Sequence, residues 1–481
     1  MNYSVISRYV GMALFMNAVF MLISALVSAG NGYDSSFSPL IMSAIITFVC
    51  GVFPMIFVKN KPEINNKEGF VIVVLAWIFS CIFGMLPYIL YGGEFSIANA
   101  WYESVSGYTT TGATILTNVE GIPKGLHFWR ASTHWLGGMG VVLFMLLILP
   151  ALSSIRMRVS KMEISDLSRE NFRYKARQTI TIIAIVYVGL TVIETILLMF
   201  AGMSLFEAVV HSFSTVATGG FSTRNLSVKA FNSFPVELII MIFMILSGLH
   251  FGLLFGAVSG KSNKLFKSPI VKLYIGSILI GGAFVGLNLF FAGIYDNLAT
   301  CLRHGYFQVI SCGTATGFAS EDSSVWPGFS MLVITYFTLS CACSGSTTGG
   351  IKVDRIWIFF KSVKAQIIKQ LHPNAVVSVK VGKNILESDI AHSVSLFIAL
   401  YLFIVLIVAM LLTLMGVGVT EAVSGSIANM ANCGPGFGAV GSLGNYSSIP
   451  DAGKILLGFE MLLGRLEIYP LILVFSIRRW R

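Results

Sequence analysis

The amino-acid sequence predicts an all-α polytopic membrane protein in which one structural unit occurs four times. Of its 481 residues, 55% are hydrophobic and only 11% are charged, whereas a soluble domain carries about 25% charged residues. A Gly-centred polar turn also follows a half-length apolar segment at four places along the chain. We therefore expect four parallel units around a pseudo-four-fold pore, each with a span, a pore helix, a turn and a second span. Two further spans precede them.

Ten apolar stretches are long enough to cross a bilayer, which takes about 20 residues. The first has no small-residue cleavage site, so we expect a retained span and not a signal peptide. The ten lie near residues 9–30, 38–58, 70–91, 127–151, 178–201, 234–259, 269–293, 326–344, 388–416 and 452–477. Four shorter, half-apolar segments have the length of re-entrant half-helices; they lie near 96–109, 203–216, 297–312 and 419–430.

These elements divide the chain into five expected parts. Residues 1–69 form two N-terminal transmembrane spans, and the rest forms four pore repeats: 70–155, 156–262, 263–385 and 386–481. The third repeat also contains a predicted intramembrane gating loop.

Positive charge predicts the orientation. With the N-terminus inside and the spans alternating, most of the 32 Lys and Arg residues fall on inner segments, as the positive-inside rule requires. Lys124, Arg224 and Lys229 are the clearly outer ones. Ten spans then place both termini in the cytoplasm. The net charge of +10 is mostly topological and requires no nucleic-acid partner.

The four turns are the candidate ion site. We align them on Gly112, Gly219, Gly317 and Gly434. Dehydrating K⁺ is expensive, so a selective pore replaces its water with backbone carbonyls, and glycine gives the backbone freedom to aim them. Half-helices before each turn would direct their negative ends at the ion. The candidate carbonyls belong to Thr110, Thr111, Ala217, Thr218, Ala315, Thr316, Asn432 and Cys433.

The fourth turn, Asn432-Cys433-Gly434-Pro435, departs from the Thr-x-Gly pattern. It predicts a filter whose four sides do not coordinate identically. The alternative is that all four segments are merely tight turns.

The four turns and ten spans resemble the TrkH/KtrB/HKT superfamily of potassium transporters, and most closely its bacterial Trk-type membrane subunit, over essentially the whole length. The resemblance implies a single-chain selectivity filter and a homodimer in the bacterial inner (plasma) membrane. It also implies a cytosolic, TrkA-like partner ring that binds nucleotides. K⁺ is then the only ligand expected on this chain, with no covalently bound cofactor.

Arg465 lies in the middle of the last span. A charge at the bilayer centre costs roughly 2.5–3.5 kcal/mol or more, so it should face a cavity or a partner. We expect a positive barrier in the pore below the filter, and the family resemblance supports this. The alternative is an internal ion pair with Glu467 or Glu460.

A run of small residues, 340–350, interrupts the second span of the third repeat. Small residues and glycines hold a helix poorly, and a broken helix at membrane depth must line a cavity or lie buried in protein. We expect a gating loop beneath the filter; the alternative is a close helix contact of small residues. The loop residues are Gly345, Ser346, Thr347, Thr348, Gly349 and Gly350.

Several other features are discounted. Residues 256–262 imitate a phosphate-binding loop but are one residue short and end a span. Cys341 and Cys343 have no adjacent His to complete a metal site. Arg130 is expected to snorkel or to cap carbonyls. Packing roles are expected for His127, His134 and His211, and outer surface charge, or attraction of cations to the mouth, for Glu94, Glu103, Glu120, Glu321 and Asp322.

The expected function is uptake of K⁺ driven by the membrane potential and regulated by a cytosolic partner that docks on basic inner segments near 156–177, 261–272 and 361–383. An enzyme is not expected, because no paired acid–base or nucleophile constellation lies within the spans. The alternative is a transporter coupled to Na⁺ or H⁺, for which Glu194 is the best candidate to carry the coupling ion.

Overall fold

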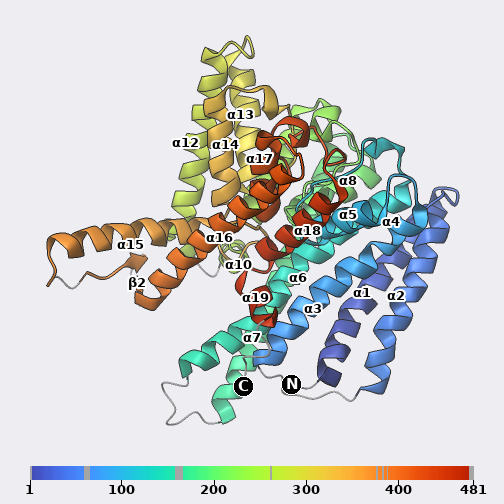
Figure 1. Cartoon of the computed structure of the whole chain (residues 1–481), viewed down its shortest axis with the longest axis horizontal. Coiled ribbons are helices and arrows are strands. Elements are labelled where there is room, and N and C mark those ends of the chain that lie inside the picture. The colour runs from blue at the N-terminus through green and yellow to red at the C-terminus, as the bar shows by residue number, and fades with distance from the viewer. Residues whose placement is uncertain are drawn as a thin grey trace.

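The computed structural model is built almost entirely from α-helices (Figure 1). It describes residues 3–58, 66–157, 166–260, 263–374, 377–381, 384–386 and 388–475. Within these residues the β-structure is one antiparallel two-stranded ladder, β1 (Lys380–Val381) with β2 (Asn384–Ile385). The expected all-α class is confirmed.

The chain opens with a helical hairpin, α1 (Tyr3–Gly30) and α2 (Phe37–Phe57), at the right edge of Figure 1. Glycines let the two backbones approach closely, since a Cβ at Gly51 would lie 2.8 Å from the Phe15 nitrogen. Small residues commonly allow such close packing between membrane helices. The hairpin packs through α1 on α3 and α6 of the first unit.

Four units follow, each with a first helix, a pore helix, a turn, a short 3₁₀ helix and a second helix. Unit 1 has α3 (Asn66–Gly84), α4 (Leu86–Tyr91), α5 (Ile97–Tyr108), η1 (Val119–Gly121) and α6 (Lys124–Met157). Unit 2 has α7 (Asp166–Phe200), α8 (Leu205–Val216), η2 (Ser227–Phe231), α9 (Phe234–Ser247) and α10 (Phe251–Val258). After α11 (Lys264–Lys267), unit 3 has α12 (Pro269–Phe291), α13 (Leu298–Gly313), η3 (Ser323–Val325), α14 (Gly328–Ser340) and α15 (Val353–Leu371). Unit 4 has α16 (Ser388–Leu414), α17 (Val419–Met430), η4 (Gly438–Val440), α18 (Asp451–Arg465) and α19 (Tyr469–Phe475).

The pore helices α5, α8, α13 and α17 begin at defined residues. Ser96 Oγ accepts a hydrogen bond from Asn99 N, and Ser204 Oγ accepts one from Glu207 N, both at 3.3 Å. Asn297 Oδ1 does the same for Ala299 N at 2.9 Å. Such side chains satisfy amide groups that have no carbonyl partner in the first turn of a helix. The caps fix where three of the four pore helices start, and each pore helix then ends directly at its turn.

The second helices of units 2, 3 and 4 are broken. In unit 2, α9 and α10 meet at 109°, so the span expected at 234–259 is sharply bent and not one continuous helix. In unit 3, α14 has only 13 residues and a loop separates it from α15, which Figure 1 shows projecting to the left. In unit 4, Glu467 and Ile468 adopt left-handed φ values of 57° and 61° between α18 and α19, so the span expected at 452–477 is not continuous either.

Six helices in the described ranges are long and apolar enough to cross a membrane, or seven if the bent α9–α10 pair counts as one span. The chain is therefore a multi-pass membrane protein, and these six helices lie at six of the ten expected spans. Three of the other expected spans lie at the short or interrupted second helices of units 2, 3 and 4, and the expected span 127–151 lies within the continuous helix α6.

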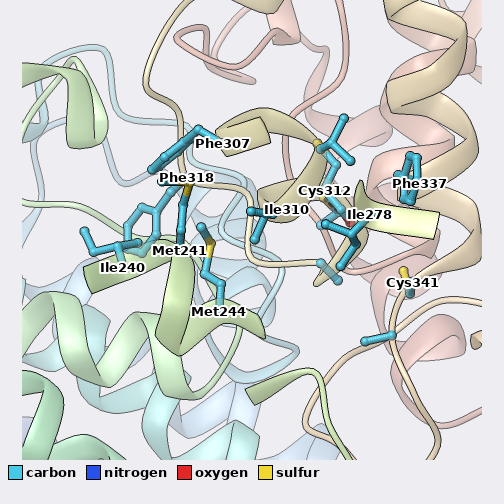
Figure 2. Close-up of a cluster of buried hydrophobic side chains, with 14 of the residues drawn as sticks. Ile240, Met241, Met244, Ile278, Phe307, Ile310, Cys312, Phe318, Phe337 and Cys341 are labelled. Carbon is cyan, nitrogen blue, oxygen red and sulfur yellow. Dashed lines mark hydrogen bonds between the residues drawn. The ribbon is translucent and has the colours of Figure 1, made fainter. Parts of the chain in front are cut away.

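A buried hydrophobic cluster fastens unit 2 to unit 3 (Figure 2). Ile240 and Met244 of α9 and Phe307 and Ile310 of α13 are among its members, each at most 5% exposed. Fully burying such a side chain contributes about 1.5–3 kcal/mol. This packing sets the pore helix of unit 3 against α9, and so helps to determine where its turn lies.

Candidate functional site

The four turns share one backbone conformation. Each turn begins at the residue that caps the C-terminus of its pore helix. The residue after this cap has a left-handed φ, and the glycine two positions further along the chain has one as well. The first left-handed residues are Thr110, Thr218, Ala315 and Asn432, with φ of 52–56°. The glycines are Gly112, Gly220, Gly317 and Gly434, with φ of 78–92°. Glycine has no Cβ and therefore adopts a left-handed φ without steric strain.

This conformation corrects the sequence alignment in unit 2. The counterpart of Gly112 is Gly220, so the alignment on Gly219 is wrong by one residue. Gly219 instead matches Thr111, Thr316 and Cys433, and Ala217 matches the helix caps Thr109, Thr314 and Ala431. The equivalent carbonyls of unit 2 therefore belong to Thr218 and Gly219, and Ala217 lies one residue too early.

Each turn is anchored to its own pore helix by the same two main-chain hydrogen bonds. In unit 1, Thr110 N donates to Gly107 O at 3.0 Å and Thr111 N donates to Ser106 O at 2.9 Å. The equivalent bonds in the other units are Thr218 to Thr215, Gly219 to Ser214, Ala315 to Cys312, Thr316 to Ser311, Asn432 to Asn429 and Cys433 to Ala428, all at 2.7–3.1 Å.

The four turns close a ring. Each glycine lies so near a carbonyl of the next unit that an added Cβ would collide with that oxygen. Gly112 faces the carbonyl of Gly219, Gly220 that of Thr316, Gly317 that of Cys433, and Gly434 that of Thr111. The order of contacts is unit 1 to 2 to 3 to 4 and back to 1. The pore helices therefore converge at this ring with their C-terminal, partly negative ends.

The loop between α14 and α15, residues 341–352, contains the predicted gating residues and lies against this ring. Thr347 Oγ1 donates to Val216 O at 3.2 Å, at the end of the unit 2 pore helix, and lies 3.4 Å from Thr218 Oγ1. Gly349 lies against the Ala431 carbonyl at the end of the unit 4 pore helix. Of the predicted loop residues, Gly345 is exposed, whereas Ser346, Thr347, Thr348, Gly349 and Gly350 are buried.

The loop and the break in unit 2 satisfy each other's backbone. Cys343 N donates to Gly248 O at 3.1 Å, and Phe251 N donates to Gly345 O at 3.3 Å. Irregular backbone within a membrane is tolerated only where protein or water satisfies its polar groups. The two interruptions are therefore structurally dependent on one another.

Arg465 lies on the same side of the ring and is only 4% exposed. Its Nη1 donates to Thr347 O at 2.7 Å and its Nη2 to Gly137 O at 3.4 Å. The alternative of an ion pair with Glu467 or Glu460 is wrong. Glu467 pairs with Arg355 at 2.7 Å, and Glu460 accepts from Ser426 Oγ at 2.6 Å. The guanidinium is thus held by the carbonyl oxygens of two other units.

A second buried cation, Lys352, was not expected. The sequence places it on an inner segment, but it is only 5% exposed. Its ammonium donates to the Thr348 carbonyl and lies 3.0 Å from Thr348 Oγ1. The available signal was its position two residues after the glycine pair of the loop, between Ile351 and Val353.

Glu103 and Arg130 form a buried ion pair at 2.7 Å, with exposures of 0% and 2%. This contradicts the expected surface location of Glu103 and the expected snorkelling of Arg130. Glu103 also accepts from Ile115 N at 3.1 Å, and the Arg130 guanidinium lies 4.1 Å from the centre of the Phe221 ring. The pair therefore joins the pore helix and α6 of unit 1 to the turn of unit 2.

The remaining expected features have local structural contacts. His134 stacks on Phe221 with ring centres 4.1 Å apart and fills the space beside Gly219. His211 bonds Ser222 Oγ at 3.0 Å, and His127 is buried. The other outer acids bond nearby groups: Glu94 bonds Thr117, Glu120 bonds Asn225, Glu321 bonds Lys229 and Asp322 bonds Ser324. Among the described residues no group of His, Cys, Asp and Glu could hold a metal ion.

Part of the predicted basic surface lies outside the described residues. This concerns Lys59, Lys61, Arg158, Lys161, Lys261, Lys383, Arg478, Arg479 and Arg481. It also concerns Ser262, which completes the phosphate-loop look-alike.

Several known proteins are similar to this chain over its whole length. A family model described as "TrkH: Cation transport protein" matches residues 37–273 and 295–479. The Trk system potassium uptake protein TrkH of Salmonella typhimurium is 34% identical over the full length of both chains, and that of Escherichia coli K12 is 33% identical. The crystal structure of the potassium transporter TrkH from Vibrio parahaemolyticus matches with a TM-score of 0.90, covering all of both chains at 29% identity.

Proposed function

The chain belongs to the TrkH family of cation transport proteins, and we propose that it carries K⁺ into a bacterial cell through the ring of its four turns. Its relatives in Salmonella and Escherichia are named potassium uptake proteins. K⁺ is then the transported ion, and the protein is a transporter and not an enzyme.

The observation that carries the proposal is the closed ring of glycines and carbonyls. The carbonyls of Thr111, Gly219, Thr316 and Cys433 each lie against the filter glycine of a neighbouring unit, which closes the ring. We propose that these four carbonyls, with those of the preceding residues Thr110, Thr218, Ala315 and Asn432, face the path of the ion. Carbonyl dipoles arranged in this way can replace the hydration shell of K⁺. We propose that this ring is the selectivity filter, that Arg465 is the barrier beneath it, and that the loop from Gly345 to Gly350 is the gate.

The driving force in this proposal is the membrane potential, which supplies about 2.3 kcal/mol per elementary charge at 100 mV. A cytosolic, nucleotide-binding ring would control the loop by docking on the basic inner segments and on α15. We also propose a homodimer within the lipid of the inner membrane, with both termini in the cytoplasm. Family resemblance and the distribution of basic residues support these points.

Tracer flux in proteoliposomes tests the function. Wild-type protein should take up ⁸⁶Rb⁺ in response to an imposed electrical potential alone. Gly112→Ser should reduce this uptake or its preference over ²²Na⁺, because the new side chain would meet the Gly219 carbonyl. Gly276→Ala is a matched control, since a Cβ there meets no atom within 4 Å. Absence of wild-type Rb⁺ flux would exclude the proposal.

A second candidate is coupled uptake with Na⁺ or H⁺. Glu194 of α7 is fully buried beside Thr215 of the unit 2 pore helix, and Glu460 of α18 is 1% exposed. Buried carboxyl groups of this kind serve as ion relays in coupled transporters. Rb⁺ uptake that requires an added Na⁺ or pH gradient, and that Glu194→Gln abolishes, would favour this candidate over the channel-like one.

A further inference from the structure

The four sides of the ring are alike in backbone but different in side-chain support. We name them walls 1 to 4, comprising residues 109–112, 217–220, 314–317 and 431–434. Walls 1 and 3 read Thr-x-Thr-Gly, whereas walls 2 and 4 read Ala-x-Gly-Gly and Ala-x-Cys-Gly. Opposite walls therefore resemble each other, and the ring has two-fold rather than four-fold chemistry.

Walls 1 and 3 are braced by their own units. Thr109 and Thr111 hydroxyl oxygens lie 2.8 Å apart, as do those of Thr314 and Thr316. A serine on each pore helix reaches past the turn as well. Ser106 Oγ donates to Ala113 O at 2.6 Å, and Ser311 Oγ donates to Phe318 O at 2.6 Å.

These serines clamp the residues on both sides of the filter glycine. The Ser106 carbonyl accepts from Thr111 N while its hydroxyl donates to Ala113 O. Ser311 makes the same two contacts with Thr316 N and Phe318 O. The glycine between the two contacts is thereby fixed in orientation, and so is the carbonyl that precedes it.

Walls 2 and 4 lack this brace. The equivalent position in unit 2 is Ser214, whose hydroxyl is buried with no hydrogen-bond partner in the described structure. In unit 4 the equivalent residue is Ala428, which has no hydroxyl. Ala217 and Ala431 likewise cannot form the threonine pair. Wall 4 is held instead from other elements, since Tyr446 Oη donates to Gly434 O at 2.7 Å.

The gating loop touches the walls that lack the brace. Thr347 contacts wall 2 through Thr218 and the Val216 carbonyl just below it, and Gly349 lies against Ala431 of wall 4. Within the described residues, the hydrogen bonds from the loop to the ring go to unit 2. The loop therefore contacts the two walls that lack the serine and threonine hydrogen bonds of walls 1 and 3.

We propose that Ser106 and Ser311 are positioning residues that set ion discrimination at walls 1 and 3, and that Thr347 couples the gate to wall 2. This inference rests on the proposed function of the ring as a K⁺ filter. On this proposal, walls 1 and 3 keep a fixed conformation, whereas the conformation of walls 2 and 4 depends on the position of the loop.

The first test compares three serine-to-alanine variants at the same position of three pore helices. The Rb⁺/Na⁺ uptake ratio should fall about two- to tenfold in Ser106→Ala and in Ser311→Ala, the range expected for one lost hydrogen bond. Ser214→Ala, the matched control, should keep the wild-type ratio because its hydroxyl has no partner. Equal Rb⁺/Na⁺ uptake ratios in all three variants would show that the hydrogen bonds of Ser106 and Ser311 do not set ion discrimination. Thermal stability in detergent identifies a variant that has merely failed to fold, and the second serine then still tests the idea.

The second test is a double-mutant cycle on initial Rb⁺ uptake. Thr347→Val and Thr218→Val should be non-additive because each removes the same contact, whereas Thr347→Val and Ser106→Ala should be additive. If the effects of Thr347→Val and Thr218→Val on Rb⁺ uptake were additive, Thr347 would not couple the loop to wall 2.

Gly112→Ser distinguishes failure of this inference from failure of the proposed function. If Gly112→Ser changes the ion ratio and the serine variants do not, only the brace is wrong. If Gly112→Ser also leaves the ratio unchanged, the filter assignment itself fails.

Discussion

The proposed filter ring and the loop 341–352 are both irregular backbone, yet they are held in different ways. Each filter turn bonds to its own pore helix three to five residues earlier in the chain, as Thr111 does to Ser106. The loop has local bonds too, such as Ser346 Oγ to Cys343 O at 2.6 Å, but it also bonds to other units, through Thr347 to Val216, Arg465 to Thr347 and Cys343 to Gly248. The main-chain bonds of the turns are local, whereas the position of the loop depends on tertiary contacts as well.

In the function proposed above, this difference lets one chain hold a fixed filter beside a movable gate. A filter turn would lose its bonds only if the end of a pore helix unwound, whereas the loop would move by exchanging contacts with neighbouring units. Substitutions in the ring should therefore impair permeation, while substitutions around the loop should alter gating.

The largest effect is expected for Gly220→Ala, which tests both the local design of the ring and the corrected alignment. Gly220 has a φ of 81°, and an added Cβ would meet the Thr316 carbonyl. The left-handed conformation alone costs roughly 1–2 kcal/mol outside glycine, and the carbonyl must also move. We expect at least a tenfold loss of ⁸⁶Rb⁺ uptake, the loss that about 1.4 kcal/mol or more would produce. Wild-type uptake in Gly220→Ala would contradict the ring described here.

A smaller effect of opposite sign is expected for Arg465→Ala. Removing the guanidinium takes away a buried positive charge beneath the ring and the donor to Thr347 O. Rb⁺ uptake should rise about threefold or more, because the repulsion of a unit charge is substantial where water is scarce. Arg224→Ala is the control, since Arg224 is 44% exposed and pairs with Glu207 away from the ring. Unchanged or reduced uptake in correctly folded Arg465→Ala would exclude the barrier.

Lys352→Met should act in the same direction but more weakly. The lysine binds Thr348, one residue beyond the Arg465 contact, and so stabilises the loop from within its own unit. Methionine keeps the length of the side chain and removes its charge. We expect an increase in Rb⁺ uptake smaller than that of Arg465→Ala, with Lys364→Met, an exposed site on α15, as the unchanged control. An increase larger than that of Arg465→Ala would reverse the order of importance of the two cations.

The sequence predicted the local region better than the tertiary one. The four turns could be located because glycine and small polar residues between apolar segments leave a strong pattern. Their register in unit 2 could not be assigned, because Gly219 and Gly220 both tolerate a left-handed φ and only the backbone distinguishes them. The residues of the loop were also found, since a run of small residues cannot sustain a helix.

The features that sequence could not reveal depend on partners far along the chain. The break at Gly248 is unmarked by composition because Cys343 of unit 3 satisfies it. Lys352 looked like an inner surface charge because hydropathy does not register the burial of its side chain or its contact with the Thr348 carbonyl. Glu103 and Arg130 are 27 residues apart, on different helices, and neither residue indicates its partner by spacing.

The smallest effect is expected at Asp34, which should influence folding stability but neither the ring nor the loop 341–352. Asp34 lies in the loop between α1 and α2, where it accepts from Ser28 Oγ and Ser36 Oγ at 2.5 Å and from Gly125 N at 3.3 Å. Burial raises the pKa of this carboxyl, but the hydrogen bonds outweigh burial and leave its pKa below the usual 3.8. A lowered pKa stabilises the folded protein above pH 4, and this stabilisation is lost as the pH falls through the folded value.

Asp34→Asn should therefore lower the melting temperature in detergent at pH 7 by about 1–2 °C, a small shift for a chain of this length. The difference from wild type should shrink below pH 4, where the wild-type carboxyl also becomes neutral. Asp296→Asn, in another exposed loop, should cause no comparable shift. Rb⁺ uptake should be unaffected at pH 7, because Asp34 contacts neither the ring nor the loop 341–352. If Asp34→Asn altered the Rb⁺/Na⁺ ratio, the N-terminal hairpin would have to support the filter, and the ring would not be locally maintained.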